Sequence, residues 1–178
     1  MSPALRNRVL GLALAGVIYA ADQYIKWFVK GPMRLWERQT IELLPFFDLT
    51  WAENRGISLG LFSANSTEAM WILLIVTGIV ALMVTIWLLR ERRLADIVPL
   101  ALVLGGALGN IRDRFHLGYV IDYADLHFGS FRPFLIFNLA DAAISIGVAI
   151  ILVRALFIRE KPPYPHSGGE ADPPAERS

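Results

Sequence analysis

Four long apolar segments, separated by polar connections, constrain most strongly how this chain can fold. They span residues 9–29, 70–89, 95–112 and 134–157. A helix needs about 20 predominantly apolar residues to cross the hydrocarbon core of a bilayer. The chain of 178 residues is 55% hydrophobic and only 19% charged, which is too apolar for an ordinary soluble domain of this length. The sequence therefore predicts an all-α membrane protein with four transmembrane helices.

The positions of the basic residues predict the orientation of these helices, because Lys and Arg in short connections are retained on the cytoplasmic side. They gather before the first apolar segment, between the second and third, and after the fourth, at Arg6, Arg8, Arg90, Arg92, Arg93, Arg154, Arg159 and Lys161. Both termini are therefore expected in the cytoplasm (N-in/C-in), with outer connections at 30–69 and 113–133. The first segment begins like a signal peptide, but its apolar stretch continues to Val29, which favours an uncleaved transmembrane helix.

The segments outside the predicted helices differ in character. Residues 40–51 mix Ile, Leu, Phe and Thr, so we expect a small β-element in the first outer connection. Asn65 and Glu68 have the spacing of an N-cap and its N3 partner before the second helix. Residues 160–178 are rich in Pro, Gly and charge, which predicts a disordered cytoplasmic tail. The transmembrane domain would then comprise residues 1–159.

Charge and composition exclude several functional classes. The formal net charge of +1 argues against nucleic acid as a partner, because phosphate binding needs clustered, uncompensated Lys and Arg. The chain has no cysteine, so disulfides, thiolate metal ligands and a cysteine nucleophile are excluded. The candidate catalytic side chains are then Ser, Thr, Asp, Glu, His and Lys.

Polar residues inside the predicted helices carry the most functional information, because a charge at membrane depth costs about 2.5 kcal/mol or more. In the fourth helix, Asn138, Asp141 and Ser145 fall on one face, which is expected to look into the bundle. In the first helix, Asp22 and Lys26 stand at i and i+4, in the order that favours an ion pair. Structural interpretations stay open for both: Asp141 as a hydrogen-bonding partner of other helices, and the Asp22–Lys26 pair as an interfacial anchor with a supporting role.

The segment 105–127 holds the densest cluster of polar residues and glycines. Two glycines four residues apart let the third helix approach a neighbour closely. Asn110 and Arg114 follow at i and i+4, where this helix is expected to reach the outer surface. The apolar run 119–121 then delivers Asp122 back toward the membrane face.

Two carboxylates, Asp122 from a connection and Asp141 from a helix, suit one kind of chemistry. When two Asp side chains lie close together both cannot ionise, so they share a proton. One then polarises the scissile carbonyl while the other activates water, with no metal and no covalent intermediate. This pattern favours an aspartic peptidase.

Other enzymatic interpretations fit the sequence less well. His116, Asp122, Asp125 and His127 offer metal ligands, but their spacing matches no helical zinc motif. A serine hydrolase has no G-x-S-x-G turn and no histidine in a predicted helix. Its candidate nucleophiles would be Ser58, Ser63, Ser66, Ser130 and Ser145. The non-enzymatic alternative is a small four-helix transporter or scaffold in which Asp141 handles protons or ions.

At these residues the sequence resembles the lipoprotein signal peptidases, or signal peptidase II, which are aspartic endopeptidases of bacterial inner membranes. The matching motifs are D-Q-Y-I-K at 22–26, N-R-G at 54–56, G-G-A-L-G-N-I-x-D-R at 105–114, G-Y-V-I-D-Y at 118–123 and F-N-L-A-D at 137–141. Five motifs in order, reaching to about Phe157, make the resemblance specific. Asp125 and His127, close behind Asp122, add an acid and a base near the matched positions.

The resemblance implies removal of the signal peptide from diacylglyceryl-modified prolipoproteins, by cleavage before the lipidated lipobox cysteine, without metal or cofactor. It implies Asp122 and Asp141 as the catalytic pair. The supporting or substrate-binding positions would be Asn54, Gly56, Asn110, Arg114, Asn138, Asp22 and Lys26. The family fold has four transmembrane helices and a small periplasmic β-cradle in the first outer loop. Membrane lipids and globomycin-like cyclic peptide inhibitors are the other expected partners, at a site on the outer face of the inner membrane.

Overall fold

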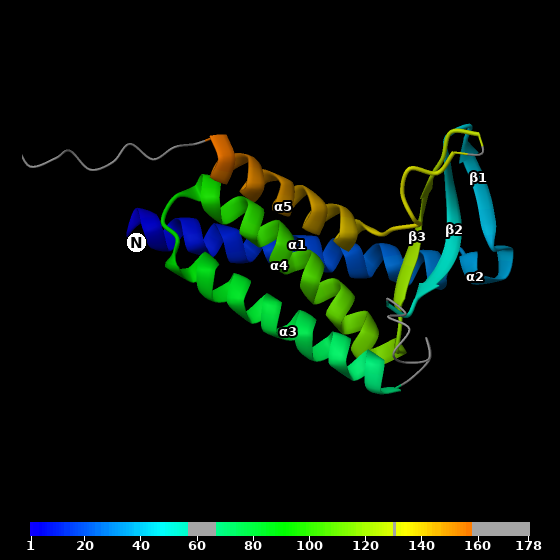
Figure 1. Cartoon of the computed structure of the whole chain (residues 1–178), viewed down its shortest axis with the longest axis horizontal. Helices are drawn as coiled ribbons and strands as arrows, with labels where there is room; N and C mark the ends of the chain where they lie inside the picture. Colours follow the sequence, from blue (N-terminus) through cyan, green and yellow to red (C-terminus); the bar gives the residue numbers. More distant parts are fainter. Residues whose placement is uncertain (57–66, 130, 158–178) are drawn as a thin grey trace, which may run out of the picture.

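The computed structural model describes residues 1–56, 67–129 and 131–157. Within these residues, four helices are long and apolar enough to cross a membrane. They are α1 (Pro3–Lys30), α3 (Thr67–Arg90), α4 (Leu94–Leu117) and α5 (Leu139–Phe157), and a short helix, α2 (Leu35–Arg38), follows α1. Figure 1 shows the four long helices as one bundle with a small sheet at one end. The expectation of a mostly helical protein with four candidate spanning helices is therefore confirmed.

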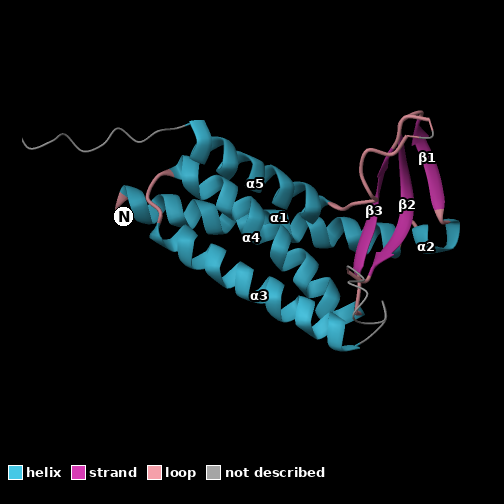
Figure 2. Cartoon of the chain, viewed as in Figure 1, coloured by secondary structure: helices cyan, strands magenta, loops and turns pink. Residues whose placement is uncertain are grey.

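The sheet has three antiparallel strands in the order β1–β2–β3 within the described residues (Figure 2). β1 (Thr40–Leu44) and β2 (Phe47–Asn54) arise from the segment whose composition predicted strands. The predicted β-element in the first connection is therefore present, and β3 (Val120–Leu126), which comes from the second connection and was not predicted, completes the sheet. Because β3 is almost completely buried, it lacks the alternation of polar and apolar residues that marks a half-exposed strand.

Helix α4 lies at the centre of the bundle and packs against α1, α3 and α5. In the most apolar stretch of 18 residues in α4, 56% is buried inside the protein. The corresponding share in α1, α3 and α5 is 11–17%. Two adjacent glycines allow this packing. A methyl group at Gly105 would lie 2.6 Å from the Ala15 carbonyl oxygen in α1, and one at Gly106 would lie 2.5 Å from the Ala140 carbonyl oxygen in α5. Larger residues would hold the three helices apart.

The fourth long helix begins later than its apolar pattern predicts, at Leu139 instead of residue 134. Asn138 and Asp141 explain the boundary through a reciprocal cap. The Asp141 backbone N–H donates to Asn138 Oδ1 at 2.9 Å, and the Asn138 backbone N–H donates to Asp141 Oδ2 at 3.2 Å. Just before this cap, Phe137 forms an isolated β-bridge with Ala124 of β3.

Other predicted bounds also move. α1 begins earlier than predicted, at Pro3, and α4 continues to Leu117, where Gly118 takes a left-handed conformation with φ +79°. The proposed N-cap Asn65 and the tail 160–178 lie outside the described residues.

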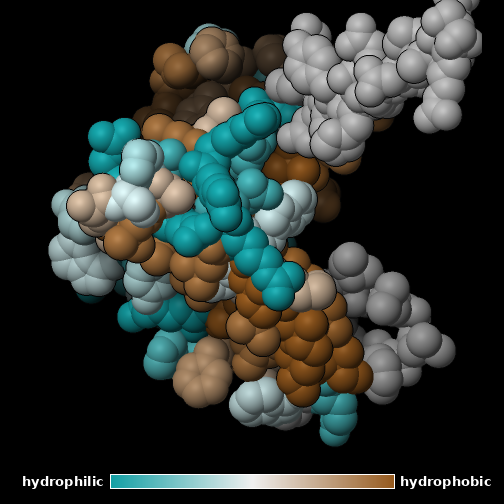
Figure 3. All heavy atoms as spheres, turned by 90° about the vertical axis from the view of Figure 1, so that its left-hand side faces the viewer, coloured by the Kyte–Doolittle hydropathy of each residue, from teal (hydrophilic) through white to brown (hydrophobic). Residues whose placement is uncertain are grey.

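The end of the bundle farthest from the sheet holds the basic residues near the N-terminus and between α3 and α4. Figure 3 faces this end and shows hydrophilic side chains gathered across its middle, beside a hydrophobic surface. Arg8 Nε donates to the Glu91 carbonyl oxygen at 2.9 Å, and Asn7 Nδ2 donates to the Arg92 carbonyl oxygen at 2.9 Å. These bonds tie the start of α1 to the α3–α4 connection.

Candidate active site

Asp122 and Asp141 come together where the sheet meets the helix bundle. Asp122 belongs to β3 and is 2% exposed, and Asp141 lies in the first turn of α5. Asn138 contacts both carboxylates. Its Nδ2 donates to Asp122 Oδ1 at 2.6 Å, and its backbone N–H donates to Asp141 Oδ2 at 3.2 Å. The cap of α5 thus fixes the two acids relative to each other.

Asn110, from α4, holds the other oxygen of Asp141. Asn110 Nδ2 donates to Asp141 Oδ1 at 2.8 Å, while Asn110 Oδ1 accepts from Lys26 Nζ at 3.0 Å and from Asn138 Nδ2 at 3.3 Å. Because an amide oxygen only accepts and an amide nitrogen only donates, the lysine on one side fixes which end of Asn110 faces Asp141. Asp141 therefore receives two donors, one from each neighbouring asparagine.

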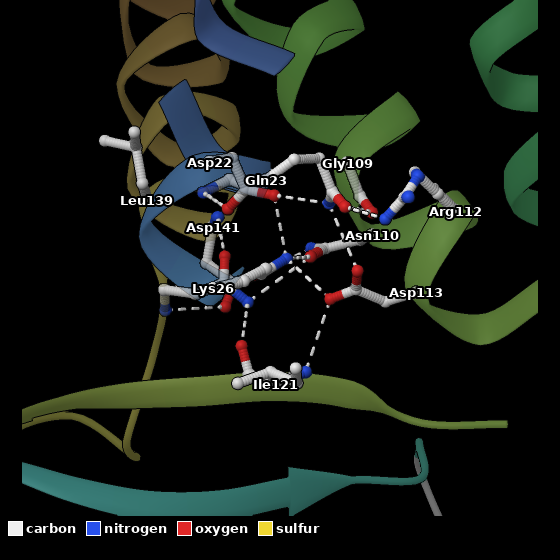
Figure 4. Close-up of polar contacts among 12 residues, drawn as sticks. Asp22, Gln23, Lys26, Gly109, Asn110, Arg112, Asp113, Ile121, Leu139 and Asp141 are labelled. Atoms are coloured by element: carbon white, nitrogen blue, oxygen red, sulfur yellow. Dashed lines mark hydrogen bonds and ion pairs between the residues drawn. The ribbon is translucent and has the colours of Figure 1, made fainter. Parts of the chain in front are cut away.

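Lys26 occupies the middle of a buried ion network, and Figure 4 shows its side chain among residues of α1 and α4. Its Nζ lies 2.9 Å from Asp22 Oδ2 and 2.9 Å from Asp113 Oδ2. With Asn110 Oδ1, these oxygens give one acceptor to each of the three ammonium N–H groups. Asp22 Oδ1 in turn accepts the Ala140 backbone N–H at 3.1 Å. Asp22 and Lys26 thereby connect α1 to the start of α5 and to α4.

Gln23 and Asp113 complete this network, and neither was assigned a role from the sequence. Gln23 Nε2 donates to Asp113 Oδ1 at 3.1 Å and to the Gly109 carbonyl oxygen at 3.2 Å, and Arg112 donates to Gln23 Oε1 (Figure 4). Asp113 Oδ2 also accepts the Ile121 backbone N–H at 3.4 Å, so it joins α4 to β3 beside Asp122. The sequence feature that could have pointed to Gln23 and Asp113 is their location, because both lie inside motifs that carried the family resemblance.

The surroundings of Asp122 favour its protonated form. Burial is the largest cause and the charge of Asp141 the second, and together they raise the pKa of Asp122 to about 6. Hydrogen bonds from Asn54 and Asn138 and the charge of Lys26 oppose this rise. A carboxyl group with such a pKa exchanges its proton closer to neutral pH than an ordinary Asp does. This is the electrostatic condition for a shared proton.

The remaining predicted positions have different environments. Asn54 ends β2 and hydrogen-bonds Asp122, and its Oδ1 accepts the Gly56 backbone N–H at 3.0 Å. Gly56 has φ +97°, a conformation that favours glycine, and its backbone N–H contacts Asn54. Arg114 lies within the electrostatic influence of Asp122, Asp141 and Asp113, and its Nε is buried without a hydrogen-bond partner among the described residues.

Two cavities open beside the carboxylates. One, of about 520 Å³, is lined by Ala52, Asn54, Asp122, Asp125, Arg132, Pro133, Phe134, Leu135 and Ile136. The other, of about 220 Å³, is lined by Phe134, Phe137, Asp141, Ala142 and Ser145. Phe134 borders both cavities. Ser145 is exposed in the second cavity and does not point into the bundle core as its helix position predicted.

The residues considered for a metal site or for a serine hydrolase are only partly brought together by the fold. Asp125 and His127 lie near each other with Asp48 as their third neighbour, whereas Asp122 and His116 are not in that group. His116 is exposed and contacts the Phe115 ring. Four candidate serine nucleophiles lie outside the described residues, at Ser58, Ser63, Ser66 and Ser130. Ser145 is described, but no histidine lines its cavity.

Comparison with known families bears on this geometry directly. A family model described as signal peptidase (SPase) II matches residues 14–157. The chain belongs to the signal peptidase II family. That match includes both carboxylates, the two asparagines between them and the Lys26 network.

Curated relatives agree with this membership in the signal peptidase II family. A lipoprotein signal peptidase of Sphingopyxis alaskensis is 52% identical over 171 residues, covering 96% of this chain and 94% of the relative. One from Rhizorhabdus wittichii is 49% identical over 154 residues, covering 86% and 90%. A solved bacterial membrane enzyme structure, determined by the in meso method at 1.9 Å resolution, superposes with a TM-score of 0.72. It is 28% identical and covers 83% of this chain and 93% of that one.

Proposed function

We propose that this chain is an aspartic endopeptidase that removes the signal peptide from diacylglyceryl-modified prolipoproteins, cutting before the lipidated cysteine. Membership in the signal peptidase II family and the names of the curated relatives support the substrate class. The observation that carries the aspartic mechanism is the bridge from Asn138 to both Asp122 and Asp141. The family gives no support to the transporter or scaffold alternative.

The hydrogen bonds suggest which carboxyl group holds the proton. Asp141 accepts a hydrogen bond on each oxygen, from Asn110 Nδ2 and from the Asn138 backbone N–H, so both of its oxygens already act as acceptors. Asp122 accepts from Asn138 through Oδ1, and its pKa, raised to about 6, lets it take up a proton on the remaining oxygen nearer to neutral pH than an ordinary Asp does. In this assignment Asp122 is the acid and Asp141 is the base.

The reaction then proceeds in two balanced steps. Asp141 takes a proton from water as the water oxygen attacks the scissile carbonyl carbon, and Asp122 gives its proton to the carbonyl oxygen, which yields a gem-diol. Asp141 next protonates the leaving nitrogen, the C–N bond breaks, and Asp122 recovers a proton from one hydroxyl. Both carboxyl groups return to their starting forms. Asn54 and Arg114 would position the substrate backbone beside them.

The larger cavity offers a place for the substrate and for cyclic peptide inhibitors of the globomycin class. Phe134 and Leu135 on its rim are 61% and 91% exposed, although both are apolar. Exposed apolar side chains beside a membrane-facing site suit a lipidated substrate. We place this rim at the outer face of the bacterial inner membrane, with both termini in the cytoplasm, because the N-terminal segment and the short α3–α4 connection, both rich in Arg, lie at the opposite end of the bundle.

The experiment is cleavage of a synthetic diacylated lipobox peptide by the purified protein in detergent, with a chelator present. Asp122→Asn and Asp141→Asn should each lower kcat by roughly 10³-fold or more, because neither step can proceed with one carboxyl group. Asp96→Asn is the matched control, since Asp96 pairs with Arg154 away from the site. It should keep a rate near that of the wild type.

Three results would contradict the proposal. A near-normal rate in either site variant would exclude the acid pair. Loss of wild-type cleavage in chelator, with the protein still folded, would indicate a metallopeptidase. Absence of cleavage by folded wild type with and without chelator would leave the non-enzymatic alternative.

A further inference from the structure

Three acids, Glu42, Asp48 and Asp125, lie side by side across the three strands of the sheet, farther along β3 than Asp122. The strand register pairs Glu42 of β1 with Asp48 of β2, and Asp48 with Asp125 of β3. Directly paired residues of antiparallel strands project from the same face, with Cβ atoms about 5 Å apart. Like charges in such positions are destabilising unless something compensates them. This row of carboxylates therefore needs positive charge.

The cations near this row compensate it only partly. Arg132 lies 3.3 Å from Asp125 Oδ2, and Thr50 Oγ1 donates to the same oxygen at 3.5 Å. Asp125 is 1% exposed, yet its Oδ1 has no hydrogen-bond partner among the described residues. A buried carboxylate oxygen without a partner costs free energy, which a bound ligand would recover. The contacts on Oδ2 also hold the carboxylate so that Oδ1 has a fixed direction.

His127 lies beside these acids with both ring nitrogens available. Its backbone N–H donates to the Phe46 carbonyl oxygen at 3.0 Å, which holds the residue against the start of β2. Its Nε2 lies 3.8 Å from Asp48 Oδ2, too far for a hydrogen bond. Its Nδ1 is buried and has no partner in the part of the chain that the structure describes. Among the described residues, this imidazole has no hydrogen bond on Nδ1 and only a 3.8 Å contact on Nε2, beside two buried carboxylates, so the cluster is incomplete.

We propose that Asp48, Asp125 and His127 bind a divalent transition-metal ion of the zinc type. One carboxylate oxygen of each acid and one ring nitrogen of His127 lie within 4.8 Å of one another. Ligand atoms around a tetrahedral zinc ion with bonds of about 2.0–2.1 Å are about 3.3 Å apart. The distance of 3.8 Å between Asp48 Oδ2 and His127 Nε2 is close to that separation. A small movement of the two side chains toward each other would give the tetrahedral spacing.

The donor types select the class of metal. Imidazole nitrogen with carboxylate oxygen suits zinc and its neighbours, whereas Ca²⁺ takes six to eight oxygen ligands and Mg²⁺ prefers oxygen in octahedral geometry. The charges also balance: three carboxylates and Arg132, with a neutral imidazole, leave two negative charges for one divalent ion. A cavity of about 510 Å³, lined by Glu42, Asp48 and His127 among others, gives the ion access from solvent. Glu42 or water would be the fourth ligand.

This ion would be structural and takes no part in the cleavage chemistry. Asp122 is outside the cluster, although Asp125 also lines the groove next to Asp122. By joining Asp48 of β2 to Asp125 of β3 and to the residue just past β3, the ion would fasten the two strands that carry Asn54 and Asp122. The inference does not depend on the proposed peptidase mechanism.

The test is calorimetric titration of Zn²⁺ into the full chain in detergent, after chelator treatment and buffer exchange, with a purification tag that lacks histidine. We expect one Zn²⁺ bound per chain. Asp48→Asn and His127→Gln should each weaken binding by about tenfold or more. The chain has three histidines, so His116→Gln and His166→Gln are matched controls, and both should bind as the wild type does.

A second measurement separates lost binding from lost folding. Zn²⁺ should raise the thermal unfolding midpoint of the wild type and of both histidine controls, and leave that of His127→Gln unchanged. Mg²⁺ and Ca²⁺ at the same concentration should have little effect. Zinc binding that survives in Asp48→Asn and His127→Gln, or that disappears in a histidine control, would overturn the site. Absence of zinc binding by folded wild type would identify the cluster as a pairing of His127 with the acids, without metal.

Discussion

At the scale of single residues, Asp122 is placed where its ionised form is disfavoured. Folding removes the carboxylate from water and brings it near Asp141, so its pKa rises from 3.8 to about 6. A group whose pKa is raised on folding lowers stability as the pH rises from the unfolded value through the folded one. Above pH 6 the folded protein therefore carries the full destabilisation.

Replacing this acid should accordingly stabilise the protein while inactivating it. At pH 7.5, Asp122→Asn is expected to raise the free energy of unfolding by up to about 3 kcal/mol, at 1.36 kcal/mol per tenfold change in proton affinity. The gain should shrink as the pH is lowered from 6 toward 4. Unfolding midpoints of the wild type and the variant across this range are the measurement. An equal difference at pH 7.5 and pH 4 would show that Asp122 is not perturbed.

Among the buried polar residues, sequence reasoning most readily identified those whose significance depends on spacing along one helix. The Asp22–Lys26 pair follows from an i, i+4 rule, and the ion pair is present at 2.9 Å. Gln23 and Asp113 were not predicted, because their contacts join α1 to α4 and α4 to β3. No local pattern encodes a bond between residues 90 positions apart in the chain. Asp48 was missed as a partner of His127 for the same reason.

At the scale of helices and strands, apolar composition predicted where helices exist more reliably than where they start. The segment before Leu139 is as apolar as the helix that follows, so hydropathy alone extended α5 to residue 134. The boundary is set by the cap between Asn138 and Asp141 and by the pairing of Phe137 with Ala124. β3 was missed because a buried strand carries no alternating pattern.

The close approach of α4 to its neighbours gives a prediction at this scale. Gly106→Ala should lower the free energy of unfolding by about 1–3 kcal/mol, because the added methyl group would lie 2.5 Å from the Ala140 carbonyl oxygen and force α4 and α5 apart. Gly78→Ala in α3 is the matched control, since nothing lies within 4 Å of its added methyl group. Thermal unfolding in detergent measures both. A Gly106→Ala midpoint equal to that of Gly78→Ala would contradict this account of the packing.

At the scale of the whole molecule, the proposed orientation can be tested on a chain with no background thiol. Arg38→Cys, at the sheet end, should react with a membrane-impermeant thiol reagent in intact spheroplasts. Arg92→Cys, in the α3–α4 connection, should react only after permeabilisation. Both variants replace an exposed arginine, so the comparison is matched. The reverse labelling pattern would put the carboxylates on the cytoplasmic face.

Because α4 is enclosed by the other three helices, a change in bilayer thickness affects those three helices more directly than it affects α4. α1, α3 and α5 present most of their apolar surface outward, so they are the helices that tilt when the hydrocarbon layer is thinner or thicker than their apolar length. α4 meets protein on most sides, and its C-terminal half supplies Asn110 and Asp113 to the buried network. A change in lipid composition would therefore alter the positions of the two carboxylates mainly through tilting of α1 and α5, which the hydrogen bond between Asp22 and Ala140 connects.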